Sequence, residues 1–147
     1  MLHELSVRNL GVIEDVTIVL GPGVTALTGE TGAGKTLVVE AIDLLVGGRA
    51  DAVLVRPGAA EAWVEGRFEA ADGTDVILAR AVPAGGRSRA YVDGRMAPVS
   101  ALSEWGDRLV DLHGEHAHQS LLSAGLQRAA LDTYGRVDLG PLEAARP

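Results

Sequence analysis

Apolar and polar residues alternate along the first part of the chain. The alternation runs from Leu2 to Val7 and resumes from Val12 to Leu20, after a break at residues 9–11. A period of two is typical of half-buried strands, so the two runs predict a hairpin or the start of a meander. A short apolar run from Val24 to Thr28 predicts a third strand.

The period then changes to that of a helix. Between Lys35 and Val46 one helical face collects the apolar residues, and the acidic residues lie on the other side. Two consecutive glycines, Gly47 and Gly48, predict the end of this helix. The apolar face is formed by Leu37, Val38, Ala41, Ile42 and Leu45.

The second half of the chain is predicted to begin with an irregular connection, residues 49–60. Three β-like runs follow, separated by Asp-Gly and Gly-Gly pairs, which favour an antiparallel meander. These runs cover residues 62–70, 75–82 and 87–92. Three more elements are then predicted: a helix from an N-cap at Ser100 to Trp105, a strand from Leu109 to Leu112, and a helix over residues 119–133.

Composition narrows the class of protein. The 147 residues are 47% apolar, which suggests one globular domain or a fragment of one. Without cysteine there is no disulfide and no thiolate metal site. No apolar run is long enough for a signal peptide or a membrane span, so we expect a soluble, cytoplasmic protein. A net charge of −7 argues against binding nucleic acid through bulk electrostatics. A local basic strip at Arg87, Arg89 and Arg95 remains compatible with it.

A glycine-rich segment between the third predicted strand and the helix carries the clearest chemistry. Residues 29–36, GETGAGKT, match the pattern G-x-x-x-x-G-K-[ST]. Glycines let successive backbone N–H groups converge on a polyphosphate, and the helix N-terminus adds partial positive charge. Lys35 would bind the β- and γ-phosphates, and the Thr36 hydroxyl would bind Mg²⁺. The predicted nucleotide contacts are Gly29, Glu30, Thr31, Gly32, Ala33, Gly34, Lys35 and Thr36.

Lys35 is the only lysine among 13 basic residues. The other interpretation of the segment is a glycine-rich turn that merely begins a helix. A chain that uses arginine elsewhere has its single lysine where a phosphate loop needs a compact charge, and this favours nucleotide binding.

Three classes of phosphate-loop protein are compatible with the motif. Asp111 and Gly114 match the D-x-x-G element of small GTPases, but guanine recognition needs a second lysine. A self-contained phosphotransferase would use Asp111 as its metal carboxylate, yet such kinases have parallel βαβ units where this chain predicts a meander. ABC-type ATPases have antiparallel strands on both sides of the phosphate loop.

Within the third class, four segments in order resemble the RecN family of bacterial SMC-like ATPases. They are LTGETGAGKT, LVVEAIDLLVGGRAD, VRPGAAEAWVEGRF and LVDLHGEHAHQSLL, and the opening strands are similar too. The resemblance extends to about residue 135. It implies an α/β P-loop fold, the N-terminal lobe of an ABC/SMC-type head, with a mixed sheet and an antiparallel β meander.

The resemblance also implies a function and partners. It implies ATP and Mg²⁺ as cofactors and recombinational repair of DNA double-strand breaks as the process. Residues 1–135 would form the lobe, and residues 136–147 would begin the connection to an absent coiled coil. Hydrolysis would need the C-terminal lobe of the same protein and a second head in a homodimer, so the isolated chain is expected to be inactive. The full protein would bind DNA at the nucleoid, with no membrane partner.

The remaining candidate residues follow from the same resemblance. The loop from His113 to Gln119 corresponds to the family's Q-loop, which makes Gln119 or Glu115 the residue that contacts Mg²⁺ and the attacking water. Together with Lys35 these are the predicted catalytic residues, and Thr36 and Gln119 are the predicted metal ligands. Asn9 would approach the adenine or ribose.

Two motifs have alternative interpretations. The three histidines of H-x-x-H-x-H, residues 113–118, can bind zinc or can simply form a polar loop. Arg49 and Arg56 follow the first helix, where related heads place an arginine near nucleotide or DNA, and a solvated loop charge is the other interpretation.

Overall fold

The computed structural model describes residues 1–30, 34–112, 127–128, 131–132 and 134–137. The chain divides into two units, Met1–Val110 and Asp111–Pro147. In the second unit, residues 127–128, 131–132 and 134 are helical. The loop that carries Glu115 and Gln119 and most of the predicted helix 119–133 lie outside the described residues, as do Thr31, Gly32 and Ala33.

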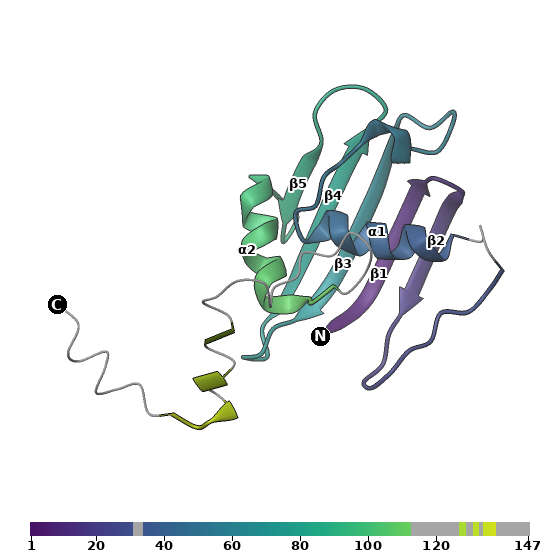
Figure 1. Ribbon diagram of the computed structural model, residues 1–147. Coiled ribbons are helices and arrows are strands. Elements are labelled where there is room, and N and C mark those ends of the chain that lie inside the picture. Colours follow the sequence, from purple (N-terminus) through teal and green to yellow (C-terminus); the bar gives the residue numbers. More distant parts are fainter. Residues whose placement is uncertain (31–33, 113–126, 129–130, 133, 138–147) are drawn as a thin grey trace. The chain divides into compact units, whose positions relative to one another are not determined.

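The first unit is a six-stranded sheet with two helices on one face (Figure 1). Its strand order is β2-β1-β3-β4-β5-β6, and each strand pairs with its neighbours in antiparallel orientation. The strands are β1 (Leu2–Leu10), β2 (Ile13–Val19), β3 (Glu61–Glu69), β4 (Asp75–Pro83), β5 (Arg89–Val92) and β6 (Arg95–Ala97). The predicted hairpin and meander are therefore confirmed, with β6 as an addition.

Helix α1 (Lys35–Leu45) crosses the sheet and supplies the centre of the core. Its buried residues Ala41, Leu44 and Leu45 pack with the inward-facing residues of β1, β3 and β4. The approach is close at Gly66 on β3, where a Cβ atom would lie 2.7 Å from Leu45 Cδ1. Strand β3 therefore needs a residue without a side chain at the point where the helix crosses it.

Helix α2 (Val99–Leu109) lies beside the C-terminal end of α1. The prediction for this region was wrong in three respects. The helix begins at Val99 after Pro98, with no side-chain cap from Ser100. It ends at Leu109 instead of Trp105, and the strand predicted from Leu109 to Leu112 does not form. Its buried contacts at Leu102 and Gly106 explain why the helix continues past Trp105. No helix among the described residues is long and apolar enough to cross a bilayer.

The predicted strand Val24–Thr28 does not form. Residues 21–30 have no strand pairing, and Val24 is 99% exposed. A strand requires a neighbour that satisfies its backbone N–H and C=O groups, and none of the described strands lies beside this segment. The parallel pairing that a mixed sheet requires is consequently absent from the described residues.

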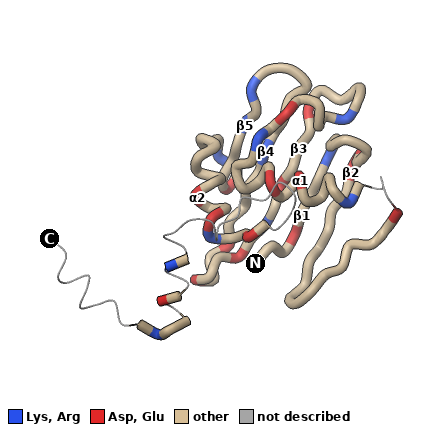
Figure 2. Tube along the Cα trace, in the orientation of Figure 1, with Lys and Arg blue, Asp and Glu red and all other residues tan. Residues whose placement is uncertain are grey.

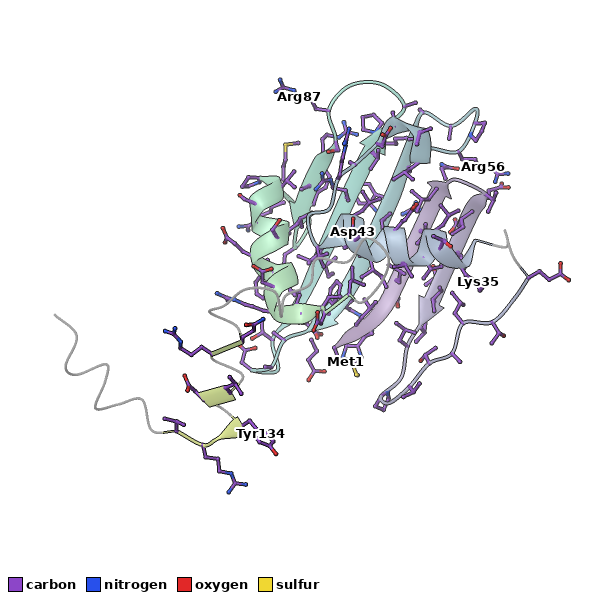
Figure 3. All side chains as sticks on the ribbon, in the orientation of Figure 1. Met1, Lys35, Asp43, Arg56, Arg87 and Tyr134 are labelled. Carbon is purple, nitrogen blue, oxygen red and sulfur yellow. The ribbon has the colours of Figure 1, made fainter. Side chains whose placement is uncertain are left out.

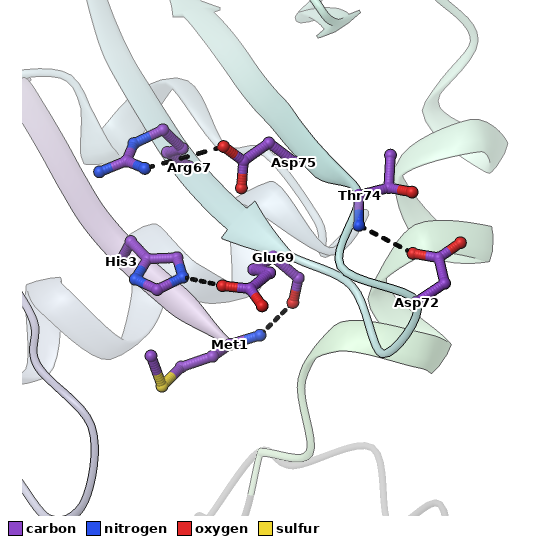
Figure 4. A network of polar contacts seen from close by, with 7 residues as sticks. All are labelled: Met1, His3, Arg67, Glu69, Asp72, Thr74 and Asp75. Carbon is purple, nitrogen blue, oxygen red and sulfur yellow. Dashed lines mark hydrogen bonds and ion pairs between the residues drawn. The ribbon is translucent and has the colours of Figure 1, made fainter.

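Polar contacts join the ends of three strands at one corner of the sheet (Figure 4). The Met1 amino group donates to the Glu69 carbonyl, and His3 Nε2 forms a 2.8 Å hydrogen bond with Glu69 Oε2. In the adjacent turn the Thr74 N–H donates to Asp72 Oδ1 at 2.9 Å and holds the pKa of the Asp72 carboxyl below its ordinary value. These contacts attach the beginning of β1 to the end of β3.

Candidate functional site

The candidate site is centred on the N-terminus of α1. Gly34 directly precedes the helix with a left-handed backbone, φ 91°, and no side chain caps the helix start. The first turn contains no acidic residue. Helix N-terminal N–H groups have no acceptor within the helix, so this end has hydrogen-bond donors and partial positive charge available for an anion.

Lys35 points back along the loop that precedes the helix. Its Nζ donates to the carbonyl oxygens of Gly29 and Glu30, each at 2.5 Å. The ammonium group therefore already lies among oxygen acceptors contributed by the predicted phosphate loop. Thr36, the next residue, lies in the first turn of α1 and is partly exposed.

The turn between β1 and β2 packs against this helix start. A Cβ atom on Gly34 would lie 3.5 Å from Val12 Cγ2, and one on Gly11 would lie 2.7 Å from Leu37 Cδ1. The close approach at Gly11, whose φ is 55°, needs a residue that has no side chain. The β1–β2 turn thus fixes one side of the candidate site.

Arg56 holds the other side of the same turn. Its Nη1 donates to the Val12 carbonyl at 2.9 Å, and its Nη2 lies 3.4 Å from Glu14 Oε2. The Arg56 N–H donates to the Asn9 carbonyl at 2.8 Å. Asn9 has a φ of 54°, which asparagine tolerates better than most residues.

These contacts border an open groove of about 450 Å³. Asn9, Glu14 and Arg56 line it together with residues 57–61. The structure therefore brings Asn9 into a groove that adjoins the β1–β2 turn, and this turn contacts the start of α1. The groove itself could not be read from the sequence, because it depends on Arg56 reaching a turn 44 residues earlier.

The residues present fit a nucleotide polyphosphate. An uncapped helix N-terminus, a left-handed glycine before it and a lysine at the first helical position are compatible with phosphate binding at this end of α1. In the described residues, no group of three or more His, Asp or Glu side chains is arranged to hold a metal ion. The predicted zinc alternative and the ligand Gln119 fall in the loop outside the described residues.

Comparisons with known proteins show what the chain is similar to. An AAA domain model matches residues 4–75. DNA repair protein RecN of Streptomyces coelicolor is 48% identical over 94% of this chain, and the RecN of Bacillus subtilis is 37% identical over 95%. The chain spans only 27% of each of these relatives.

Solved structures share the fold. A chain from work on ATP-driven dimerization and DNA-stimulated activation of SMC ATPases matches 90% of this chain, with a TM-score of 0.67 and 22% identity, and 98% of that chain is covered. The recombination mediator RecF bound to ATP matches 69% of this chain and 30% of its own, with a TM-score of 0.64 and 22% identity. With the sequence matches to DNA repair protein RecN, these findings assign the chain to the RecN family, and the solved structures show that it shares their fold.

Proposed function

We propose that this chain binds ATP and Mg²⁺ as the N-terminal lobe of an SMC-like ATPase that acts in repair of DNA double-strand breaks. The observation that carries the proposal is the start of α1, where Lys35 lies against its own loop carbonyls beside an uncapped helix N-terminus. A polyphosphate would replace those carbonyls as the partner of the lysine, and the helix N–H groups would bind its oxygens.

Each residue of the site has a defined role in the proposal. Lys35 would neutralise the β- and γ-phosphates, and Thr36 would bind Mg²⁺ through its hydroxyl. The nucleoside would extend over the β1–β2 turn toward the groove, where Asn9 and Arg56 are held together by a backbone hydrogen bond. Bound Mg²⁺ would supply charge stabilisation at the phosphates, and Gln119 or Glu115 would contact it from the Q-loop.

Hydrolysis is proposed to require a second lobe. Val24 and Leu27, which precede the phosphate loop, are 99% and 51% exposed, and this segment has no strand partner among the described residues. An apolar strand supplied by the C-terminal lobe of the same protein would satisfy both its backbone and its side chains. That lobe, with a second head, would supply the groups that orient the attacking water.

The test measures phosphate release from ATP by four samples. They are the isolated chain, the chain mixed with the C-terminal lobe, and two further mixtures in which the chain carries Gln119→Ala or Glu115→Ala. We expect no turnover by the chain alone, turnover in the mixture, and reduced turnover with little loss of ATP binding in one of the two variants.

A further comparison separates this proposal from the phosphotransferase alternative, which the relatives do not support. Steady turnover by the isolated chain that disappears in Asp111→Ala would contradict the two-lobe proposal.

In the full-length protein the ATP cycle would act on DNA at the nucleoid.

A further inference from the structure

The hairpin of β4 and β5 differs in charge from the rest of this acidic chain. Residues 76–92 contain three arginines and no aspartate or glutamate, in a protein whose net charge is −7. The arginines gather toward the loop of residues 84–88 that joins the two strands (Figure 2). The charge of this loop is therefore opposite to that of the molecule as a whole.

Arg80 lies underneath the loop and is almost completely buried. It is 3% exposed, and it projects from β4 on the same face as Val64 and Leu78, toward the core. Its Nη2 donates to Ser88 Oγ at 3.0 Å, whereas Nε and Nη1 have no hydrogen-bond partner. Burial lowers the pKa of Arg80, yet a guanidinium stays protonated at neutral pH. Its positive charge is consequently not compensated from within the described residues.

The surface of the loop is open to a ligand. Gly85 and Gly86 have no atoms within 4 Å of where a Cβ would lie, and Arg87 extends outward from the loop (Figure 3). Ser88 follows Arg87 and connects it to the buried Arg80. A phosphate oxygen that approaches the loop would meet the guanidinium of Arg87. The second guanidinium, that of Arg80, contacts the loop from the buried side through Ser88.

The neighbouring arginines do not add to this cluster. Arg89 lies 2.5 Å from Glu61 Oε2 in an ion pair, so its charge is neutralised. Arg95 is opposite Val92 in the register of β5 and β6, at the end of β5 away from the loop. The strip predicted from Arg87, Arg89 and Arg95 is therefore not continuous, and of the described arginines near the loop, those without an acidic partner are Arg87 and Arg80.

We propose that the β4–β5 loop binds a backbone phosphate of duplex DNA, with Arg87 as the exposed donor and Arg80, held through Ser88, as the supporting charge. Phosphate recognition by arginine is independent of base sequence, so the loop would position DNA without selecting a sequence. The inference rests on the proposed role in DNA repair, but it needs no bound nucleotide.

The test measures binding of the full 147-residue chain to a fluorescein-labelled duplex by anisotropy at several sodium chloride concentrations, without ATP. Arg87→Ala should weaken binding about threefold to tenfold and should reduce the slope of log K against log salt by about 1. Arg87→Glu should weaken binding further. Arg95→Ala is the matched control, because it removes an exposed arginine from the same antiparallel ribbon, and it should change neither quantity.

Two further measurements make the outcome decisive. Ser88→Ala, which frees Arg80 without removing a charge, should weaken DNA binding with an unchanged salt slope. Inorganic phosphate and poly-glutamate at matched ionic strength should compete less well than unlabelled DNA. Absence of DNA binding, an equal effect of Arg87→Ala and Arg95→Ala, or equally good competition by poly-glutamate would overturn the proposal. Because ATP affinity should be unchanged in every loop variant, failure here is distinguishable from failure of the nucleotide site.

Discussion

Lys35 and Arg80 show how differently two basic residues can be placed by one fold. At the start of α1, Lys35 donates hydrogen bonds to carbonyl oxygens of its own loop. Arg80 is instead buried beneath a hairpin, where its hydrogen-bond partner is Ser88. A hydrated, flexible ammonium suits exchange between loop oxygens and phosphate oxygens, and a planar guanidinium suits a fixed buried contact. The choice of lysine at one position and arginine at the other therefore has a physical reason.

The first prediction concerns Lys35. Replacing it with alanine removes the charge that would pair with the β- and γ-phosphates, so we expect ATP binding to weaken by about 1.5–3 kcal/mol, the range for a charged hydrogen bond. Calorimetric titration with ATP and Mg²⁺ measures the effect. Arg67→Ala serves as control, because Arg67 lies on β3 and pairs with Asp75. Equal ATP affinity in wild type and Lys35→Ala would refute the phosphate-loop assignment.

At the scale of elements, the two helices meet without room between them. A Cβ atom on Gly106 of α2 would lie 2.5 Å from Val46 Cβ and 3.0 Å from Val46 Cα. Val46 immediately follows α1, so the glycine sets how closely α2 approaches the helix that carries the phosphate loop. Since the neighbouring atoms include backbone, the contact cannot relax through a side-chain rotation alone.

The second prediction follows from this contact. In a helix, glycine to alanine normally stabilises by up to about 1 kcal/mol, but Gly106→Ala should lower the free energy of unfolding by about 1–3 kcal/mol through overpacking. Urea denaturation followed by circular dichroism measures it. Gly85→Ala, in the open β4–β5 loop, is the matched control and should change stability by less than about 0.5 kcal/mol. A stabilising effect of Gly106→Ala would show that the two helices can separate freely.

At the scale of the whole molecule, our expectation about the class of nucleotide comes from the composition of the chain and from its sheet. A guanine-reading Asn/Thr-Lys pair needs a second lysine, and Lys35 is the only one in the 147 residues. The antiparallel sheet also differs from the parallel βαβ arrangement of small-molecule kinases.

The third prediction concerns nucleotide choice. With Mg²⁺ present, the chain should bind ATP at least as tightly as GTP, because its sequence has no Asn/Thr-Lys pair to read guanine. Displacement of a labelled ATP analogue by the two nucleotides measures their relative affinities. A clear preference for GTP would instead favour the GTPase interpretation of Asp111 and Gly114.

The sequence alone determined the elements that depend on local chemistry. Alternation placed the strands of the hairpin and the meander within a few residues, and the helical period of 35–46 predicted α1 to within one residue. The phosphate-loop motif correctly placed Lys35 at the start of a helix. The motif depends on local chemistry, because its glycines allow the backbone conformation that precedes the helix. The family resemblance also came from the sequence, since four motifs in order are more specific than any one.

Tertiary structure decided everything that depends on a distant partner. The apolar run at Val24–Thr28 has strand character, but a strand forms only where another strand satisfies its backbone, so periodicity alone gave the wrong result there. The groove beside Asn9 depends on Arg56, which reaches the β1–β2 turn. The predicted arginine strip is not continuous, because the register of β5 and β6 places Arg95 at the end of β5 away from the loop. Burial of Arg80 likewise follows from the packing of the sheet, since long-range contacts set a residue's surroundings and local sequence does not.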